Sequence, residues 1–71
     1  MRISYDSQAD AAYIRFKDVA TQVTTIRLSE DVAVDLGPGE EVVGIEILSA
    51  SEHLSLNPQN PRIQLENLQA A

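Results

Sequence analysis

The segment Val42–Leu48 constrains the fold of this chain most strongly. Five of its seven residues are apolar, four of those are β-branched, and the segment follows a Gly-Pro-Gly turn at 37–39. Branched side chains fit a pleated sheet and lose rotamer freedom in a helix. This length and composition are therefore typical of a well-buried strand, which we expect to be the central strand of a small sheet.

Apolar and polar residues alternate in four further segments, each bounded by turn-forming residues. A period of two indicates a half-buried strand. The additional predicted strands are Met1–Tyr5, Ala11–Lys17, Val23–Leu28 and Val32–Leu36. The side chains expected to face the core include Ala12, Ile14, Phe16, Val32, Val34, Leu36, Val43, Ile45 and Ile47. Because the links have hairpin length, the pattern favours an antiparallel meander.

The opposite face of the predicted sheet is polar. Arg15, Arg27, Asp35 and Glu46 are spaced to lie on it, together with the outward-facing Tyr13, Ala33 and Gly44. Such charged residues usually form cross-strand pairs on a solvated face, each contributing less than about 1 kcal/mol. The missing side chain of Gly44 would let a neighbour pack closely.

A short helix is predicted after the last strand, over Ser49–Leu56. Ser49 can cap its start, and Glu52 follows three residues later as in a capping box. The fold class is therefore α+β, with a small antiparallel sheet of about five short strands covered by a short C-terminal helix. Residues 1–56 form this domain, and residues 57–71 form a tail in which 62–68 fit a helix or an edge strand equally well.

The size and composition of the chain limit what it can be. Seventy-one residues form one domain. The absence of cysteine excludes disulfides and thiolate metal sites. A core with so few aromatic residues has little net stability, so we expect a homo-oligomer or a partner-bound state. No segment resembles a signal peptide or a membrane span, which predicts a cytoplasmic protein without membrane contact.

The charge of the chain is unevenly distributed. The net charge is −6, and no basic residue occurs between Leu28 and Pro61. The acidic residues of that stretch are Glu30, Asp31, Asp35, Glu40, Glu41, Glu46 and Glu52. Such a field repels phosphate backbones, which argues against nucleic-acid binding, and it suits a basic partner protein. Simple solubilisation of a small protein is the alternative explanation.

No arrangement of residues predicts catalysis, a cofactor or a metal. Asp6 and Asp10 suggest a calcium loop, but the positions that need glycine and an acid hold Ala11 and Lys17. The single histidine, His53, has no orienting partner in the sequence and is expected to be a surface residue. We therefore expect a protein that is not an enzyme and has no catalytic, cofactor-binding or metal-binding residues.

Three segments of the chain resemble a known family. They are Tyr5–Ile14, Glu30–Asp35 and Val43–Ser51, and in this order they resemble the small prokaryotic domain family of unknown function numbered 2283. The resemblance spans about residues 1–54. It implies a compact β-sheet domain without established activity. Because genes of this family occur in pairs with others, the resemblance also implies an antitoxin-like role against a small basic toxin.

Three functions remain open from the sequence. The leading hypothesis is an interaction module that binds a basic partner protein through its acidic surface. Its candidate partner-binding residues are Glu40, Glu41, Glu46, Asp35, Tyr13 and Arg15. The alternatives are a small-ligand-binding domain that uses Tyr13, Arg15 and Gly44, and a structural homo-oligomer that buries the Tyr13 face between subunits.

Overall fold

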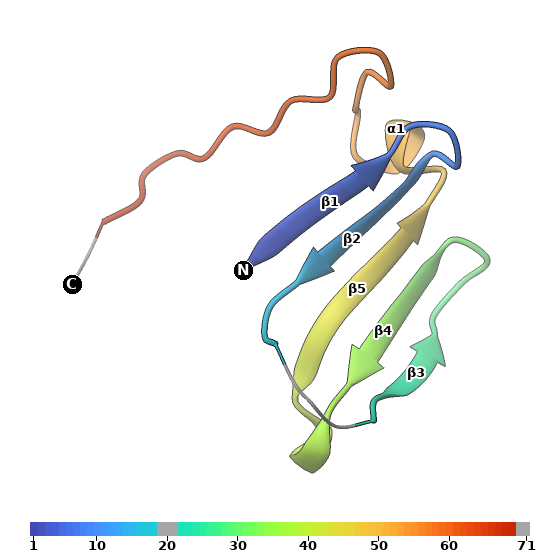
Figure 1. Cartoon of the computed structure of the whole chain (residues 1–71), viewed down its shortest axis with the longest axis vertical. Coiled ribbons are helices and arrows are strands. Elements are labelled where there is room, and N and C mark those ends of the chain that lie inside the picture. The colour runs from blue at the N-terminus through green and yellow to red at the C-terminus, as the bar shows by residue number, and fades with distance from the viewer. Residues whose placement is uncertain (19–21, 70–71) are drawn as a thin grey trace.

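The chain forms one antiparallel sheet with a short helix at one end (Figure 1). A computed structural model describes residues 1–18 and 22–69. Its strands are β1 (Arg2–Asp6), β2 (Ala11–Arg15), β3 (Thr24–Arg27), β4 (Val32–Leu36) and β5 (Val42–Leu48). A 3₁₀ turn, η1 (Pro38–Glu40), joins β4 to β5, and helix α1 (Ala50–His53) follows β5. These elements confirm the predicted α+β class with five strands and one short C-terminal helix.

The strand order is β1-β2-β5-β4-β3, with every neighbouring pair antiparallel. Strand β5 is central, as predicted. The prediction of a continuous meander is wrong, because the chain passes from β2 to the far edge at β3 and β5 then returns between β2 and β4. The central position gives the most apolar strand a hydrogen-bonded neighbour on both sides, which buries it best.

Strand β2 is shorter than its sequence pattern suggests. It ends at Arg15, and the N–H groups of both Phe16 and Lys17 donate to the carbonyl oxygen of Val43, at 2.7 and 3.3 Å. Two residues therefore share one acceptor, and the regular alternation of faces stops there. As a result Phe16, predicted to face the core, is 39% exposed.

Helix α1 is a single turn rather than the predicted helix over Ser49–Leu56. Ser49 has a left-handed backbone (φ 51°, ψ 45°), and its side chain makes no capping hydrogen bond. The predicted capping box is therefore wrong, because an N-cap side chain needs an extended backbone to reach the first free N–H groups. The turn ends at Leu54, and Ser55 is again left-handed.

The core is small, and its main cluster, made of Ala12, Ile47 and Ala50, lies at the helix end of the sheet. The buried apolar residues are Ala12, Ala33, Val43, Ile47 and Ala50. Ala33 was predicted to face outward, and it does lie on the polar face, in register with Arg27 and Glu46. It is nevertheless only 2% exposed, because its methyl group lies between those two longer side chains.

The tail after α1 is irregular. Residues 61–66 belong to no helix or strand, so neither alternative considered for residues 62–68 is seen. The tail lies on the β1 side of the sheet (Figure 1), and Ile63, Leu65 and Leu68 on it are exposed. No helix within residues 1–18 and 22–69 has the length and hydrophobicity needed to cross a membrane.

Candidate functional site

The polar face of the sheet is organised around Tyr13, whose ring lies over the backbone of Gly44. A Cβ atom on Gly44 would stand 2.5 Å from Cζ of Tyr13. The Tyr13 hydroxyl donates to Oδ2 of Asp35 at 2.7 Å, and Thr25 Oγ1 donates to Oδ1 of the same carboxylate at 2.6 Å. The expectation that Gly44 allows close packing is therefore confirmed, and the space above it is filled by Tyr13 rather than left for a small ligand.

Charged side chains surround this tyrosine. The guanidinium carbon of Arg15 lies 5.3 Å from the centroid of the Tyr13 ring, a cation–π distance. Arg27 Nη2 lies 3.7 Å from Glu46 Oε1, and both side chains are about half exposed. The strand register confirms that the charged residues predicted for one face share it. Exposed pairs of this kind contribute little to stability, so they can exchange for contacts with another molecule.

Hydrogen bonding changes the acidity of the two central groups. The hydrogen bonds from Thr25 and Tyr13 hold the pKa of Asp35 below its usual value. The same bond to Asp35 raises the pKa of Tyr13, and partial desolvation raises it further. Asp35 is thus ionised and Tyr13 protonated at neutral pH, which fixes the tyrosine as the donor and Asp35 as the acceptor of this bond.

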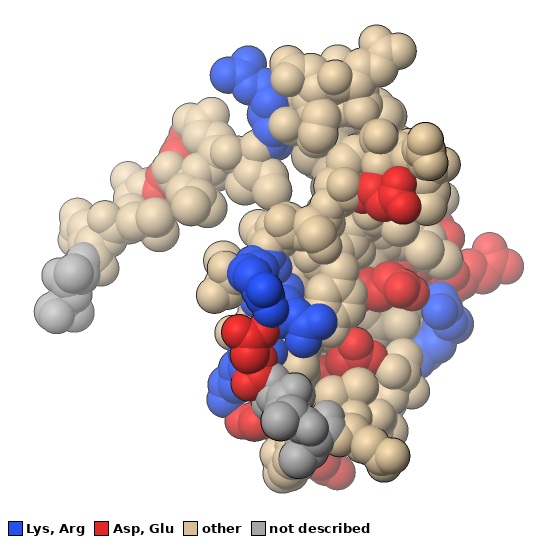
Figure 2. Space-filling view, in the orientation of Figure 1, with Lys and Arg blue, Asp and Glu red and all other residues tan. Residues whose placement is uncertain are grey.

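The six candidate partner-binding residues fall in two places. Tyr13, Arg15, Asp35 and Glu46 lie together on the polar face, whereas Glu40 and Glu41 lie at the turn η1 and just after it. Glu41 Oε2 lies 2.6 Å from Nζ of Lys17. Figure 2 accordingly shows basic side chains interspersed with acidic ones over the sheet. The acidic half of the sequence is therefore partly neutralised by basic residues from the other half.

His53 has a partner that the sequence could not reveal. Its Nε2 atom lies 2.8 Å from Oδ2 of Asp31, 22 residues away in the chain. Both side chains are partly exposed, and the contact links α1 to the turn before β4. Nothing within residues 1–18 and 22–69 groups three His, Asp or Glu side chains so that they could hold a metal ion.

A second cluster, which sequence reasoning missed, joins the β1–β2 turn to α1. Asp10 Oδ1 accepts hydrogen bonds from the Tyr5 hydroxyl at 2.6 Å and from the Ser51 N–H at 2.9 Å, and Oδ2 accepts from Ser51 Oγ at 2.7 Å. Its backbone oxygen accepts from the N–H of Ala50 at 2.9 Å. The sequence indicated only a turn residue at Asp10, because its partners on α1 lie 41 positions away.

This cluster shifts two further pKa values. The hydrogen bond to Asp10 raises the pKa of Tyr5 to about 12. The hydrogen bonds from Tyr5 and Ser51 lower the pKa of Asp10. Together these hydrogen bonds link the β1–β2 turn to the start of α1.

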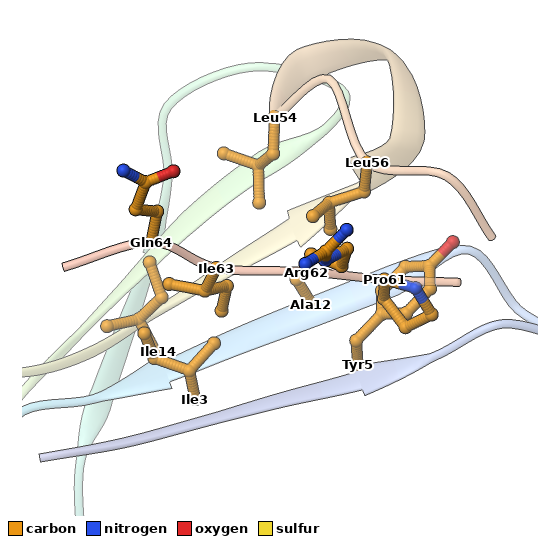
Figure 3. Close-up of a pocket in the computed structure, with 10 residues that line it drawn as sticks. All are labelled: Ile3, Tyr5, Ala12, Ile14, Leu54, Leu56, Pro61, Arg62, Ile63 and Gln64. Atoms are coloured by element: carbon orange, nitrogen blue, oxygen red, sulfur yellow. The ribbon is translucent and has the colours of Figure 1, made fainter. Parts of the chain in front are cut away.

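The opposite, apolar face carries a groove. This groove of 610 Å³ is lined by Ile3, Tyr5, Ala12 and Ile14 of the sheet, by Leu54 and Leu56, and by residues 61–64 of the tail. In Figure 3 the Ile63 side chain of the tail lies on the side toward Ile3 and Ile14. The groove is thus apolar, and one of its walls is an irregular segment.

Comparison with known proteins places most of this structure in one family. A family model described as "Protein of unknown function (DUF2283)" matches residues 2–51. That range includes all five strands and the start of α1. Neither the curated proteins nor the solved structures gave a significant match.

Proposed function

This chain belongs to the DUF2283 family of proteins of unknown function, and we propose that it is a non-enzymatic interaction module that binds a basic partner protein. The observation behind the proposal is the stretch from Leu28 to Pro61, which contains seven acids and no Lys or Arg. In its narrower form, the proposal is that the partner is a small basic toxin that this chain neutralises.

Several carboxylates of this stretch are available to a partner. Within the described ranges, Glu30, Glu40 and Glu52 have no salt-bridge partner. The contact between Arg27 and Glu46 is long and exposed. A basic partner could therefore reach free carboxylates without breaking a strong internal pair, and long-range attraction would accelerate its association in a salt-dependent way.

The test is capture of a partner by the tagged chain from its own host at low salt, identified by mass spectrometry. The expected result is a stoichiometric small basic protein that salt releases. The triple variant Glu40→Gln, Glu41→Gln and Glu46→Gln should lose it. The matched control changes the net charge equally at three other exposed positions, by Gln8→Lys, Gln59→Lys and Gln64→Lys.

The control separates a local surface from overall charge. If binding uses the acidic surface, the control variant should retain the partner. Equal loss of the partner in both variants would contradict a specific surface. If both variants still capture the partner and high salt does not release it, the electrostatic proposal is contradicted.

A further inference from the structure

We infer that the apolar face of the sheet is closed by the same face of a second copy of this chain. The strand register places one apolar residue of each strand in a single row across the sheet: Ile3, Ile14, Ile45, Val34 and Ile26. We call this set the isoleucine row. At its two ends, Ile3 is 38% exposed and Ile26 is 44% exposed.

The chain's own second layer covers only one end of this face. Ala50 packs on Ala12 and Ile47, with Tyr5, Ile14, Ile45 and Leu56 partly buried beside them. A helix of four residues is about 6 Å long, so it cannot reach across five strands. A sheet with one apolar face needs a covering layer along its whole width, and of the isoleucine row only Ile14 and Ile45 pack against this cluster.

The solvent-accessible surface area of the chain shows how much surface is left uncovered by its own packing. A compact monomer of 7.8 kDa should expose about 4,400 Å². This chain exposes 5578 Å², an excess of about 1,200 Å² over that expectation. A standard protein interface buries about 800 Å² on each partner. The excess, which includes the extended tail, is therefore large enough for a stable dimer that uses the face and the tail together.

The charge distribution favours a second copy over a basic partner on this face. The isoleucine row contains no charged residue, so a basic protein would find no counterion there. Two chains of net charge −6 repel each other, but stacking through the uncharged faces keeps the carboxylates outside. An apolar row is complementary to itself about a twofold axis, and two sheets packed face to face bury their side chains in a layer about 10 Å thick.

The tail fits the same arrangement. Its segment at 61–64 borders the groove, yet Ile63 remains 57% exposed, so the tail does not close its own sheet. Further along, Leu65 is 63% and Leu68 is 75% exposed. A second copy against the isoleucine row would supply an apolar surface for these residues. The polar Tyr13 face, an alternative oligomer surface from the sequence, stays outside.

Neighbouring residues on β1 provide a matched test, because Ile3 and Ser4 point to opposite faces. Light scattering and sedimentation should give the mass of a dimer for the wild-type chain, with an unfolding midpoint that rises with protein concentration. Ile3→Glu should weaken self-association about a hundredfold, because it buries a charge in the interface. Ser4→Glu should leave self-association unchanged. A wild-type chain that stays monomeric, or equal effects of both substitutions, would overturn the inference.

Thiol labelling keeps the test decisive if Ile3→Glu does not fold. The chain has no cysteine, so Ile3→Cys and Ser4→Cys each introduce a single reporter. In the dimer, the thiol at position 3 should react with a maleimide slowly and the thiol at position 4 rapidly. The reverse pattern would assign the interface to the polar face. A monomer with a protected thiol at position 3 would show that the chain's own tail covers the face. Either result would overturn the inference, and neither bears on the basic partner, which uses the other surface.

Discussion

Replacing Gly44 by alanine should destabilise the protein, although the backbone there accepts any residue. Among the described glycines only Gly39 has positive φ, so Gly44 is not needed for its backbone conformation. The new Cβ atom would stand 2.5 Å from Cζ of Tyr13, inside van der Waals contact, so the ring must move. The hydrogen bond from the Tyr13 hydroxyl to Asp35 then lengthens or breaks.

The magnitude follows from three opposing contributions. Removing a glycine from a strand stabilises by about 0.5–1 kcal/mol, because the unfolded chain loses conformational freedom. Overpacking costs about 1–3 kcal/mol, and loss of the hydrogen bond from Tyr13 costs about 1 kcal/mol more. The sum is a net destabilisation of about 1–3.5 kcal/mol, and each kcal/mol lowers Tm by about 4–8 °C in a domain of this size.

A double-mutant cycle isolates the cause. Thermal or urea unfolding of the wild type, Gly44→Ala, Tyr13→Ala and the double variant should be compared at one protein concentration. In the Tyr13→Ala background the same glycine substitution should stabilise by about 0.5–1 kcal/mol, since no ring stands in the way. If Gly44→Ala destabilises equally in both backgrounds, or stabilises the wild type, the contact between ring and glycine is not what requires glycine here.

Three further outcomes are expected. Stability should fall as the pH rises from about 10 to about 12, because Tyr5 keeps its proton to about 12 in the folded chain and loses it near 10 when unfolded. Denaturant titrations across this pH range should show a smaller loss of unfolding free energy for Tyr5→Phe than for the wild type. Stability should also fall as the pH drops below about 4, because folding lowers the pKa of Asp10 and Asp35. In the same titrations, Asp35→Asn should lose less unfolding free energy in acid than the wild type. Val43→Ala, at a side chain 1% exposed, should cost about 2–3 kcal/mol in urea unfolding.

Local patterns predicted the strands and the polar face well. The branched residues of β5 and the Gly-Pro-Gly turn before it indicate a strand without reference to the rest of the chain, and alternation assigned residues to faces. The close packing over Gly44 also followed from its position on a strand. These features depend on residues that are near one another in sequence, where propensity and periodicity act.

Pairing between distant segments could not be predicted in the same way. Alternation says which face Ile14 occupies, but not that its neighbour on one side is Ile45 of the last strand. Ser49 and Glu52 match a capping box, yet Ser49 has a left-handed backbone and its side chain makes no capping hydrogen bond, while the N–H of Ala50 donates to the backbone of the distant Asp10. The same residue, Asp10, explains the missed cluster, since a turn residue gives no local sign of a partner on α1.

The position of β5 has a consequence for synthesis on the ribosome. The strand made last stands between two pairs made earlier, β1–β2 and β3–β4. Isolated hairpins are marginally stable in water, so a nascent chain that has not reached Val42 holds two weak hairpins with no shared neighbour. Productive folding must then wait for the last strand and proceed through contacts between distant segments, which is slow. Until β5 is made, the edges of β2 and β4 that it will cover are free to pair with another chain. Synthesis is therefore the stage at which this protein is most exposed to misassembly.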